Sequence, residues 1–153
     1  MDRFASDPRR RRILVLAVGS LFAAGGGRTG ARGNGASASD VDSPDSRFYA
    51  AALSMKRMAE SWGDQPYGAV LVFGGLVIGE GPSRVVKLGD ASAHAEREAI
   101  RDAQRKLGRD SLAGSLLYST SRPCRLCEAA AAKAGVARMI FGADLTDAGR
   151  PKL

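Results

Sequence analysis

His94-Ala95-Glu96 and Pro123-Cys124-Arg125-Leu126-Cys127 are the two segments from which the fold and the chemistry of this chain can be inferred. The chain of 153 residues contains one histidine and two cysteines, and all three fall in these segments. One imidazole nitrogen and two thiolates can bind zinc tetrahedrally and leave a fourth position open for water. Because Cys124 and Cys127 stand at i and i+3, a helix that begins at Pro123 places both sulfurs on one face.

A second helix is predicted from Ala93 to Leu107, and Gly108 ends it. His94 and Glu96 then fall in its first turn, so two helix N-termini point at the metal and favour thiolate over thiol. Glu96 is not needed as a ligand, and its carboxylate is free to move the protons of a metal-held water.

The two cysteines have a competing interpretation. A C-x-x-C pair that follows a strand is also typical of a disulfide or of a thioredoxin-type redox pair. From the residues alone, a thiol–disulfide protein therefore stays open beside the zinc site.

The order histidine-x-glutamate, then proline-cysteine-x-x-cysteine, is the signature of zinc-dependent base deaminases. The sequence resembles the cytidine deaminase-like superfamily, and within it the branch of bacterial guanine deaminases and tRNA adenosine deaminases. The resemblance extends from about residue 48 to residue 147, and four segments carry it: Pro66–Val72, Asp90–Glu96, Leu117–Thr120 and Val136–Ala143.

This resemblance implies a zinc cofactor and a hydrolytic enzyme. Water at the open metal position would attack the amino-bearing ring carbon of a nucleobase or nucleoside and release ammonia. The implied zinc ligands are His94, Cys124 and Cys127, and the implied catalytic acid/base is Glu96. The substrate-binding candidates are Tyr67, Ser83 and Ala95. A guanine-like base is favoured, because Tyr67 stands where guanine deaminases place an aromatic residue.

Two positions depart from the pattern of the family. Arg122 stands where the family usually has glutamate, and Ser83 stands where it usually has a substrate-contacting asparagine. These departures leave open a catalytically impaired zinc-binding relic, and a tRNA adenosine deaminase of the same branch is the second candidate enzyme. Family resemblance also implies a homodimer.

The hydrophobic periodicity predicts a three-layer α/β/α sandwich with a central mixed sheet. An antiparallel pair of strands is expected to join right-handed parallel crossovers. Gly74-Gly75 predicts a two-residue hairpin turn with positive φ. The expected helices cover 47–62, 93–107 and 123–134, and the expected strands cover 69–73, 76–79, 116–120 and 138–141. Residues 85–91 are expected to form a loop, and the pattern predicts no definite structure for the tail of residues 144–153.

The formal charge of +7 is concentrated near the N-terminus. Residues 1–38 carry seven Arg and two Asp, or +5, whereas the other residues carry 16 Lys or Arg and 14 Asp or Glu, or +2. RNA binding depends on neutralising phosphates. The nearly neutral domain over 39–153 therefore favours a small-molecule nucleobase or nucleoside over nucleic acid as the partner.

Residues 1–38 are predicted to be an export signal with a Gly- and Ala-rich linker. Four arginines, Arg9–Arg12, precede the apolar run Ile13–Ala24, and Ala36-Ser37-Ala38 offers an A-x-A cleavage site. The expected location is periplasmic, by the Sec or the twin-arginine route. Membrane contact is expected only through this signal, because the apolar run is too short to span a bilayer. A misassigned start codon would instead make the protein cytoplasmic.

Overall fold

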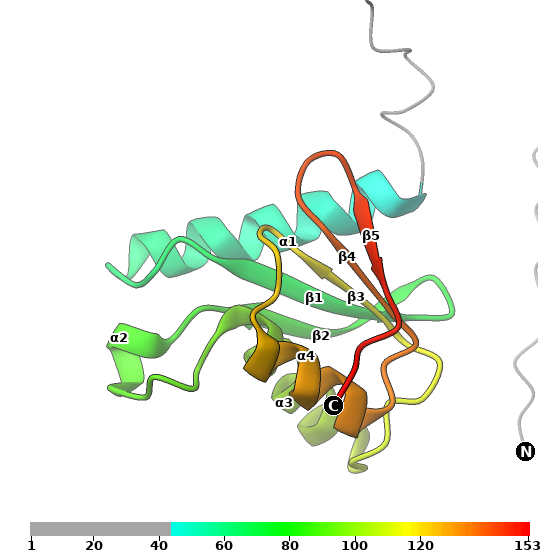
Figure 1. Cartoon of the computed structure of the whole chain (residues 1–153). Helices are drawn as coiled ribbons and strands as arrows, with labels where there is room; N and C mark the ends of the chain where they lie inside the picture. Colours follow the sequence, from blue (N-terminus) through cyan, green and yellow to red (C-terminus); the bar gives the residue numbers. More distant parts are fainter. Residues whose placement is uncertain (1–43) are drawn as a thin grey trace, which may run out of the picture. The chain divides into compact units, whose positions relative to one another are not determined.

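The computed structural model describes residues 44–153, so the predicted export signal lies outside the described part of the chain. Three long helices and five strands, together with one helix of a single turn, make up this part (Figure 1). In chain order the elements are α1 (Pro44–Ser61), β1 (Gly68–Phe73), β2 (Leu76–Pro82), α2 (Val85–Leu88), α3 (Ala95–Leu107), β3 (Leu116–Ser119), α4 (Arg125–Ala134), β4 (Arg138–Phe141) and β5 (Thr146–Gly149).

The five strands form one mixed sheet in the order β2-β1-β3-β4-β5. Figure 1 shows α1 on one face of the sheet and α3 and α4 on the other. The predicted three-layer sandwich is therefore confirmed. One detail of the prediction was wrong: β1 pairs antiparallel with β3 as well as with β2, and only β3 and β4 run parallel. The sheet contains one parallel pair rather than a series of parallel crossovers.

Alternating side chains of the strands build a separate core on each face. Ala69 and Leu71 of β1 face α3 and α4, whereas Val70 and Val72 face α1. All four are almost fully buried, which explains why β1 lacks the polar alternation of a half-exposed strand. Two apolar layers thus hold the sheet between its helices.

Glycines in β2 let α3 lie directly on the sheet. A Cβ atom at Gly81 would overlap the carbonyl oxygen of Ala95, and a Cβ atom at Gly79 would overlap that of Ala99. Only glycine permits backbone to approach backbone this closely. The contact with Gly81 fixes the start of α3, where His94 is the N-cap and Glu96 lies in the first turn.

Short regular elements form in the segment that was predicted to be a loop and in the tail, for which no structure was predicted. Residues 85–88 form the single-turn helix α2, and residues 146–149 form the edge strand β5. The hairpin was predicted correctly: Gly74 and Gly75 have φ values of 58° and 78°. Within residues 44–153, no helix is both long and apolar enough to cross a membrane.

Asp64, in the connection after α1, holds the start of α2. Its carboxylate accepts hydrogen bonds from the backbone N–H of Lys87 at 2.8 Å, the backbone N–H of Gln65 at 2.7 Å and the hydroxyl of Ser83 at 3.0 Å. Burial acts to raise the pKa of Asp64, but these hydrogen bonds outweigh burial and lower the pKa below its ordinary value of 3.8. A side chain distant in sequence thus serves as the cap of α2.

Asp64→Asn is expected to lower the free energy of unfolding by about 1–3 kcal/mol at neutral pH, because an amide group then faces buried donors. Because folding depresses the pKa of Asp64, its contribution is complete above about pH 5 and is lost as the pH falls below about 4. Denaturant unfolding of both proteins from pH 7 to pH 3 should show the difference shrinking with acid. The exposed Asp144→Asn serves as the control, and a difference that does not vary with pH would contradict the expectation.

Candidate active site

The three predicted metal ligands lie at the beginnings of two helices. His94 is the N-cap of α3 and Cys124 is the N-cap of α4, and both have extended backbone angles. Cys127 follows in the first turn of α4 and is buried. The sequence therefore folds so that each helix presents its positive end to the same place, as its motifs predict.

The donor atoms of these three residues fit a zinc ion. The Nδ1 atom of His94 lies 3.7 Å from the Sγ atom of Cys124 and 3.5 Å from that of Cys127. All three donor atoms lie within 4.8 Å of one another. Tetrahedral zinc, with Zn–S bonds of about 2.3 Å and Zn–N bonds of about 2.0 Å, requires a nitrogen–sulfur separation of about 3.5 Å. Side chains from two separate segments thus meet at the spacing that zinc needs.

The surroundings of Cys127 favour a bound cation. Burial raises the pKa of its thiol well above the ordinary value, and the negative charge of Glu96 raises it further. A buried thiolate beside a carboxylate is costly without a compensating positive charge. A divalent ion bound by the three donors would supply that charge.

A cavity of about 430 Å³ opens beside the three ligands. Glu96, in the first turn of α3, contributes to its wall and is itself buried, with 6% of its surface exposed. Tyr67 lies at the same cavity with 44% of its surface exposed. The complete lining is Gln65, Tyr67, His94, Ala95, Glu96, Ser121, Arg122 and Cys124.

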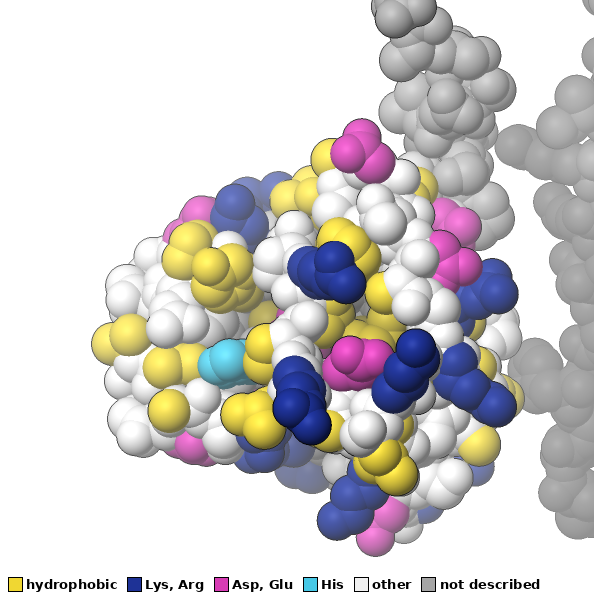
Figure 2. All heavy atoms as spheres, viewed as in Figure 1, with side chains coloured by type: hydrophobic (Ala, Val, Ile, Leu, Met, Phe, Trp, Pro, Cys, Tyr) yellow, Lys and Arg dark blue, Asp and Glu magenta, His cyan; other side chains and the backbone are white. Residues whose placement is uncertain are grey.

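The histidine at this cavity is accessible from outside. The chain has a single histidine, and Figure 2 shows a histidine side chain, in cyan, at the surface among hydrophobic and basic side chains. Leu126 and Arg125, at the start of α4, are also exposed. A ligand can therefore approach the metal donors without passing through the core.

Two of the three predicted substrate-binding residues, Tyr67 and Ala95, line this cavity, but Ser83 does not. Ser83 is fully buried, donates its hydroxyl to Asp64 and donates its backbone N–H to the carbonyl of Tyr67 at 3.0 Å. It thereby supports the segment that carries Tyr67. A substrate contact by Ser83 stays a prediction.

Three lining residues were not among the predicted site residues: Gln65, Ser121 and Arg122. They lie in the turns before β1 and after β3. In these turns the sequence shows neither the regular spacing of apolar residues that predicts helices and strands nor a spacing of metal ligands. The one signal in the sequence was the departure of Arg122 from the family pattern.

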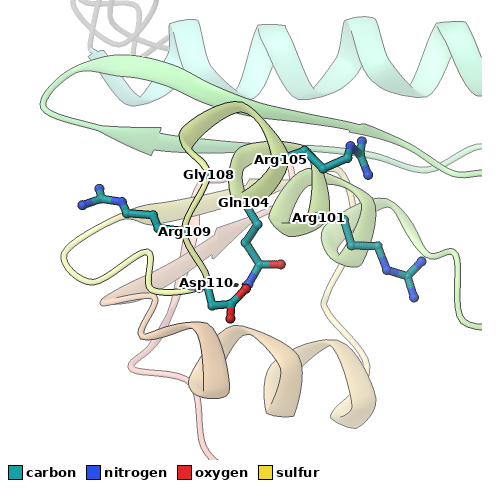
Figure 3. A pocket seen from close by; sticks show the side chains of 6 residues that line it. All are labelled: Arg101, Gln104, Arg105, Gly108, Arg109 and Asp110. Carbon is teal, nitrogen blue, oxygen red and sulfur yellow. Dashed lines mark hydrogen bonds between the residues drawn. The ribbon is translucent and has the colours of Figure 1, made fainter.

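A second hollow, of about 420 Å³, lies at the C-terminal end of α3 and is lined by Arg101, Gln104, Arg105, Gly108, Arg109 and Asp110 (Figure 3). Its arginine side chains point outward in different directions, and Gln104 donates a hydrogen bond of 2.9 Å to the carbonyl of Asp110. Arg101 and Arg105 pair with the nearby acids Glu98 and Asp102. Two of its arginines are thus neutralised by ion pairs, and its arginine side chains do not converge on one point.

Comparison with known proteins agrees with this geometry. Residues 42–143 match the family described as the cytidine and deoxycytidylate deaminase zinc-binding region. The match includes every residue of the metal-donor set as well as Glu96 and Tyr67.

Individual relatives come from two classes of deaminase. The tRNA-specific adenosine deaminase of Buchnera aphidicola is 38% identical over 67% of this chain and 68% of its own length. The guanine deaminase of Bacillus subtilis is 40% identical over 54% of this chain and 53% of its own length. A structure from a study of A-to-I editing by tRNA:A34 deaminases is 41% identical, covers 63% of this chain and 70% of its own, and superposes with a TM-score of 0.61.

The matches thus span 53% to 70% of the length of these relatives. The chain therefore belongs to the cytidine and deoxycytidylate deaminase family, as a zinc-dependent hydrolytic deaminase of nucleobases or nucleosides.

Proposed function

We propose that this protein removes the exocyclic amino group of an aminopurine base or nucleoside by hydrolysis and releases ammonia. The observation that carries the proposal is the convergence of His94, Cys124 and Cys127 beside a cavity that the buried Glu96 lines. The relatives named guanine deaminase and tRNA-specific adenosine deaminase support a purine, because guanine and adenine are both aminopurines.

His94, Cys124 and Cys127 would hold the zinc. When bound, zinc supplies the Lewis acidity that ionises water near neutral pH. Glu96 would accept one proton from the attacking water and transfer it to the ring nitrogen next to the amino-bearing carbon, while the water oxygen bonds to that carbon. The same carboxylate would then take the second proton from the new hydroxyl group and deliver it to the amino group as the C–N bond breaks. One water is consumed, a ring carbonyl replaces the amino group, and ammonia leaves.

The buried position of Glu96 suits this role. With 6% of its surface exposed, the carboxylate is shielded from bulk water and lies beside the cavity rather than in open solvent. Tyr67 offers the aromatic face on which a base can stack at the more exposed side of the cavity. Ala95, in the first turn of α3, presents backbone close to the metal donors.

A second candidate substrate is adenosine within tRNA. The similarity to tRNA-specific adenosine deaminases, at 38% identity over 103 residues, favours this candidate. The nearly neutral charge of residues 39–153 favours the free base or nucleoside instead. These two observations oppose each other, so the substrates must be compared directly.

The test is an ammonia-release screen with the full-length chain loaded with zinc. Guanine, guanosine, adenine, adenosine, cytosine and cytidine are compared with an RNA stem-loop that displays one adenosine in its loop. We expect turnover of a purine, and loss of that turnover when zinc is removed by a chelator. No ammonia from any of these compounds, by protein that contains zinc, would contradict the proposal and favour a zinc-binding relic.

We also propose that the protein is exported and that it forms a homodimer. The basic and apolar segments of residues 1–38 support export, and the family resemblance supports dimerisation. Fractionation of cells that express the full chain, and analytical ultracentrifugation of the purified protein, test these two proposals separately.

A further inference from the structure

Arg122 is the single basic side chain that lines the cavity beside the metal donors. It is exposed, whereas Glu96, the acidic side chain of the same cavity, is buried. The cavity therefore has a negative inner wall and a positive outer wall. A substrate that fills it would meet Glu96 with its reacting end and Arg122 with the end nearer solvent.

The charge of Arg122 has no acidic partner in residues 44–153. Some arginines of this part of the chain pair with carboxylates, such as Arg101 with Glu98 at 2.7 Å and Arg138 with Asp147 at 3.1 Å, whereas Arg122, like Arg125, does not. The guanidinium of Arg122 instead lies 5.9 Å from the centre of the Phe141 ring. An aromatic face supports a guanidinium without neutralising its charge, and its hydrogen-bond donors stay available for a ligand.

The backbone near Arg122 is tied to β1. Thr120 donates its backbone N–H to the carbonyl of Gly68 at 2.9 Å, and its hydroxyl accepts the N–H of Gly68 at 3.1 Å. The hydroxyl of Ser119 also donates to the carbonyl of Ser121 at 2.7 Å. These bonds hold the turn of Arg122 against the strand that Tyr67 precedes. The two side chains therefore line the cavity from segments that are fixed to each other.

We propose that Arg122 binds a phosphate group of the substrate, so that the enzyme prefers a nucleotide, free or within a strand, to the matching nucleoside. This inference rests on the proposed deaminase function. A guanidinium is planar, keeps its charge at all working pH values and can donate two parallel hydrogen bonds to phosphate oxygens. On a nucleotide, the phosphate is the group farthest from the base, which matches the distribution of charge in the cavity.

The test compares guanosine with guanosine 5′-monophosphate, and adenosine with adenosine 5′-monophosphate, for the wild type and for Arg122→Gln, Arg122→Lys and Arg122→Glu. In the wild type, kcat/KM should favour the monophosphate of the substrate pair that is turned over. Arg122→Gln should lower kcat/KM for the monophosphate by about 10- to 100-fold, the effect of losing a charge-assisted hydrogen bond. It should change kcat/KM for the nucleoside less than about twofold. Arg122→Lys should retain part of the preference, and Arg122→Glu should reverse it.

A single-stranded RNA containing guanosine and adenosine separates the two sources of phosphate. If the free nucleotide is the substrate, Arg122→Gln affects the monophosphate strongly and the RNA is not turned over. If a strand is the substrate, RNA turnover falls with Arg122→Gln and exceeds that of the monophosphate. Arg125→Gln is the matched control, because Arg125 is exposed at the start of α4 and does not line the cavity. Equal losses in Arg122→Gln and Arg125→Gln would overturn the inference.

A binding measurement separates this inference from the proposed function. Calorimetric titration of each monophosphate into Glu96→Ala, with and without Arg122→Gln, requires no turnover. If the monophosphates bind and this binding depends on Arg122, but no compound is deaminated, the proposed function is wrong and the phosphate site is supported. If nucleosides and monophosphates are turned over at equal rates and Arg122→Gln changes neither rate, the proposed function is supported and the phosphate site is wrong.

Discussion

Glu96→Ala is expected to lower kcat by about 10²- to 10⁴-fold, the usual contribution of general acid–base catalysis. Zinc content should stay at about one ion per chain, because three side chains other than Glu96 provide the donor atoms of a catalytic site. The physical reason is that Glu96 is the buried carboxylate of the cavity, and no other acidic side chain lines it. Ammonia release and metal analysis on the same preparation measure both quantities.

Glu128→Ala is the matched control for this experiment. Glu128 is also in the first turn of a helix that starts at the metal donors, but it accepts a hydrogen bond from the backbone N–H of Lys152 at 3.2 Å and does not line the cavity. Its removal should leave kcat within about twofold of the wild type, as is usual for a surface substitution. Equal turnover in Glu96→Ala and the wild type would exclude the acid–base role of Glu96.

Cys124→Ser is expected to reduce zinc from about one ion per chain to a small fraction of that. Two strong donors remain, and a serine hydroxyl is a poor replacement for thiolate. Because zinc binds the folded chain, its loss also removes stabilisation, by about 4 kcal/mol when free zinc is 1,000 times its dissociation constant. Metal analysis after dialysis, and thermal unfolding with and without a chelator, measure the two effects.

The chelator provides the decisive comparison for Cys124→Ser. The melting temperature of the wild type should fall when a chelator is added, and that of Cys124→Ser should already be low and should not change. Arg125→Gln, next in the chain, should behave as the wild type. A Cys124→Ser protein that keeps a full complement of zinc would remove Cys124 from the set of ligands.

The metal centre could be predicted because each of its ligands is positioned by a short stretch of neighbouring residues. Cys124 and Cys127 need only one helical turn to point together. His94 needs only the start of a helix, and the apolar pattern and the stop at Gly108 predict that helix. The hairpin at Gly74 and Gly75 was predictable for the same reason. What brings the two segments together is the packing of α3 and α4 on one face of the sheet.

Other features depend on contacts between segments distant in the sequence. The short helix α2 has a start that Asp64 holds from 23 residues away, so residues 85–88 alone do not predict it. The strand β5 is a short polar sequence that pairs only because β4 presents a free edge. The antiparallel direction of β3 against β1 is set by the path of the chain, which hydrophobic alternation does not encode.

The substrate side of the cavity is the least predictable part. Gln65, Ser121 and Arg122 come from turns, where no repeating pattern constrains the residue type. Their positions depend on hydrogen bonds such as that between Thr120 and Gly68. Sequence reasoning therefore identified the reactive groups more readily than the groups that select the substrate.

The direct contact of α3 with Gly79 and Gly81 has a consequence for how this enzyme could diversify. Backbone pressed on backbone tolerates almost no substitution, so the helix that carries His94 and Glu96 is locked in place. Tyr67 and Arg122 take no part in this backbone contact and lie on exposed turns. Mutations there can retune selectivity while the reaction centre is inherited unchanged, which makes positions 65, 67, 121 and 122 the natural targets of a directed-evolution library.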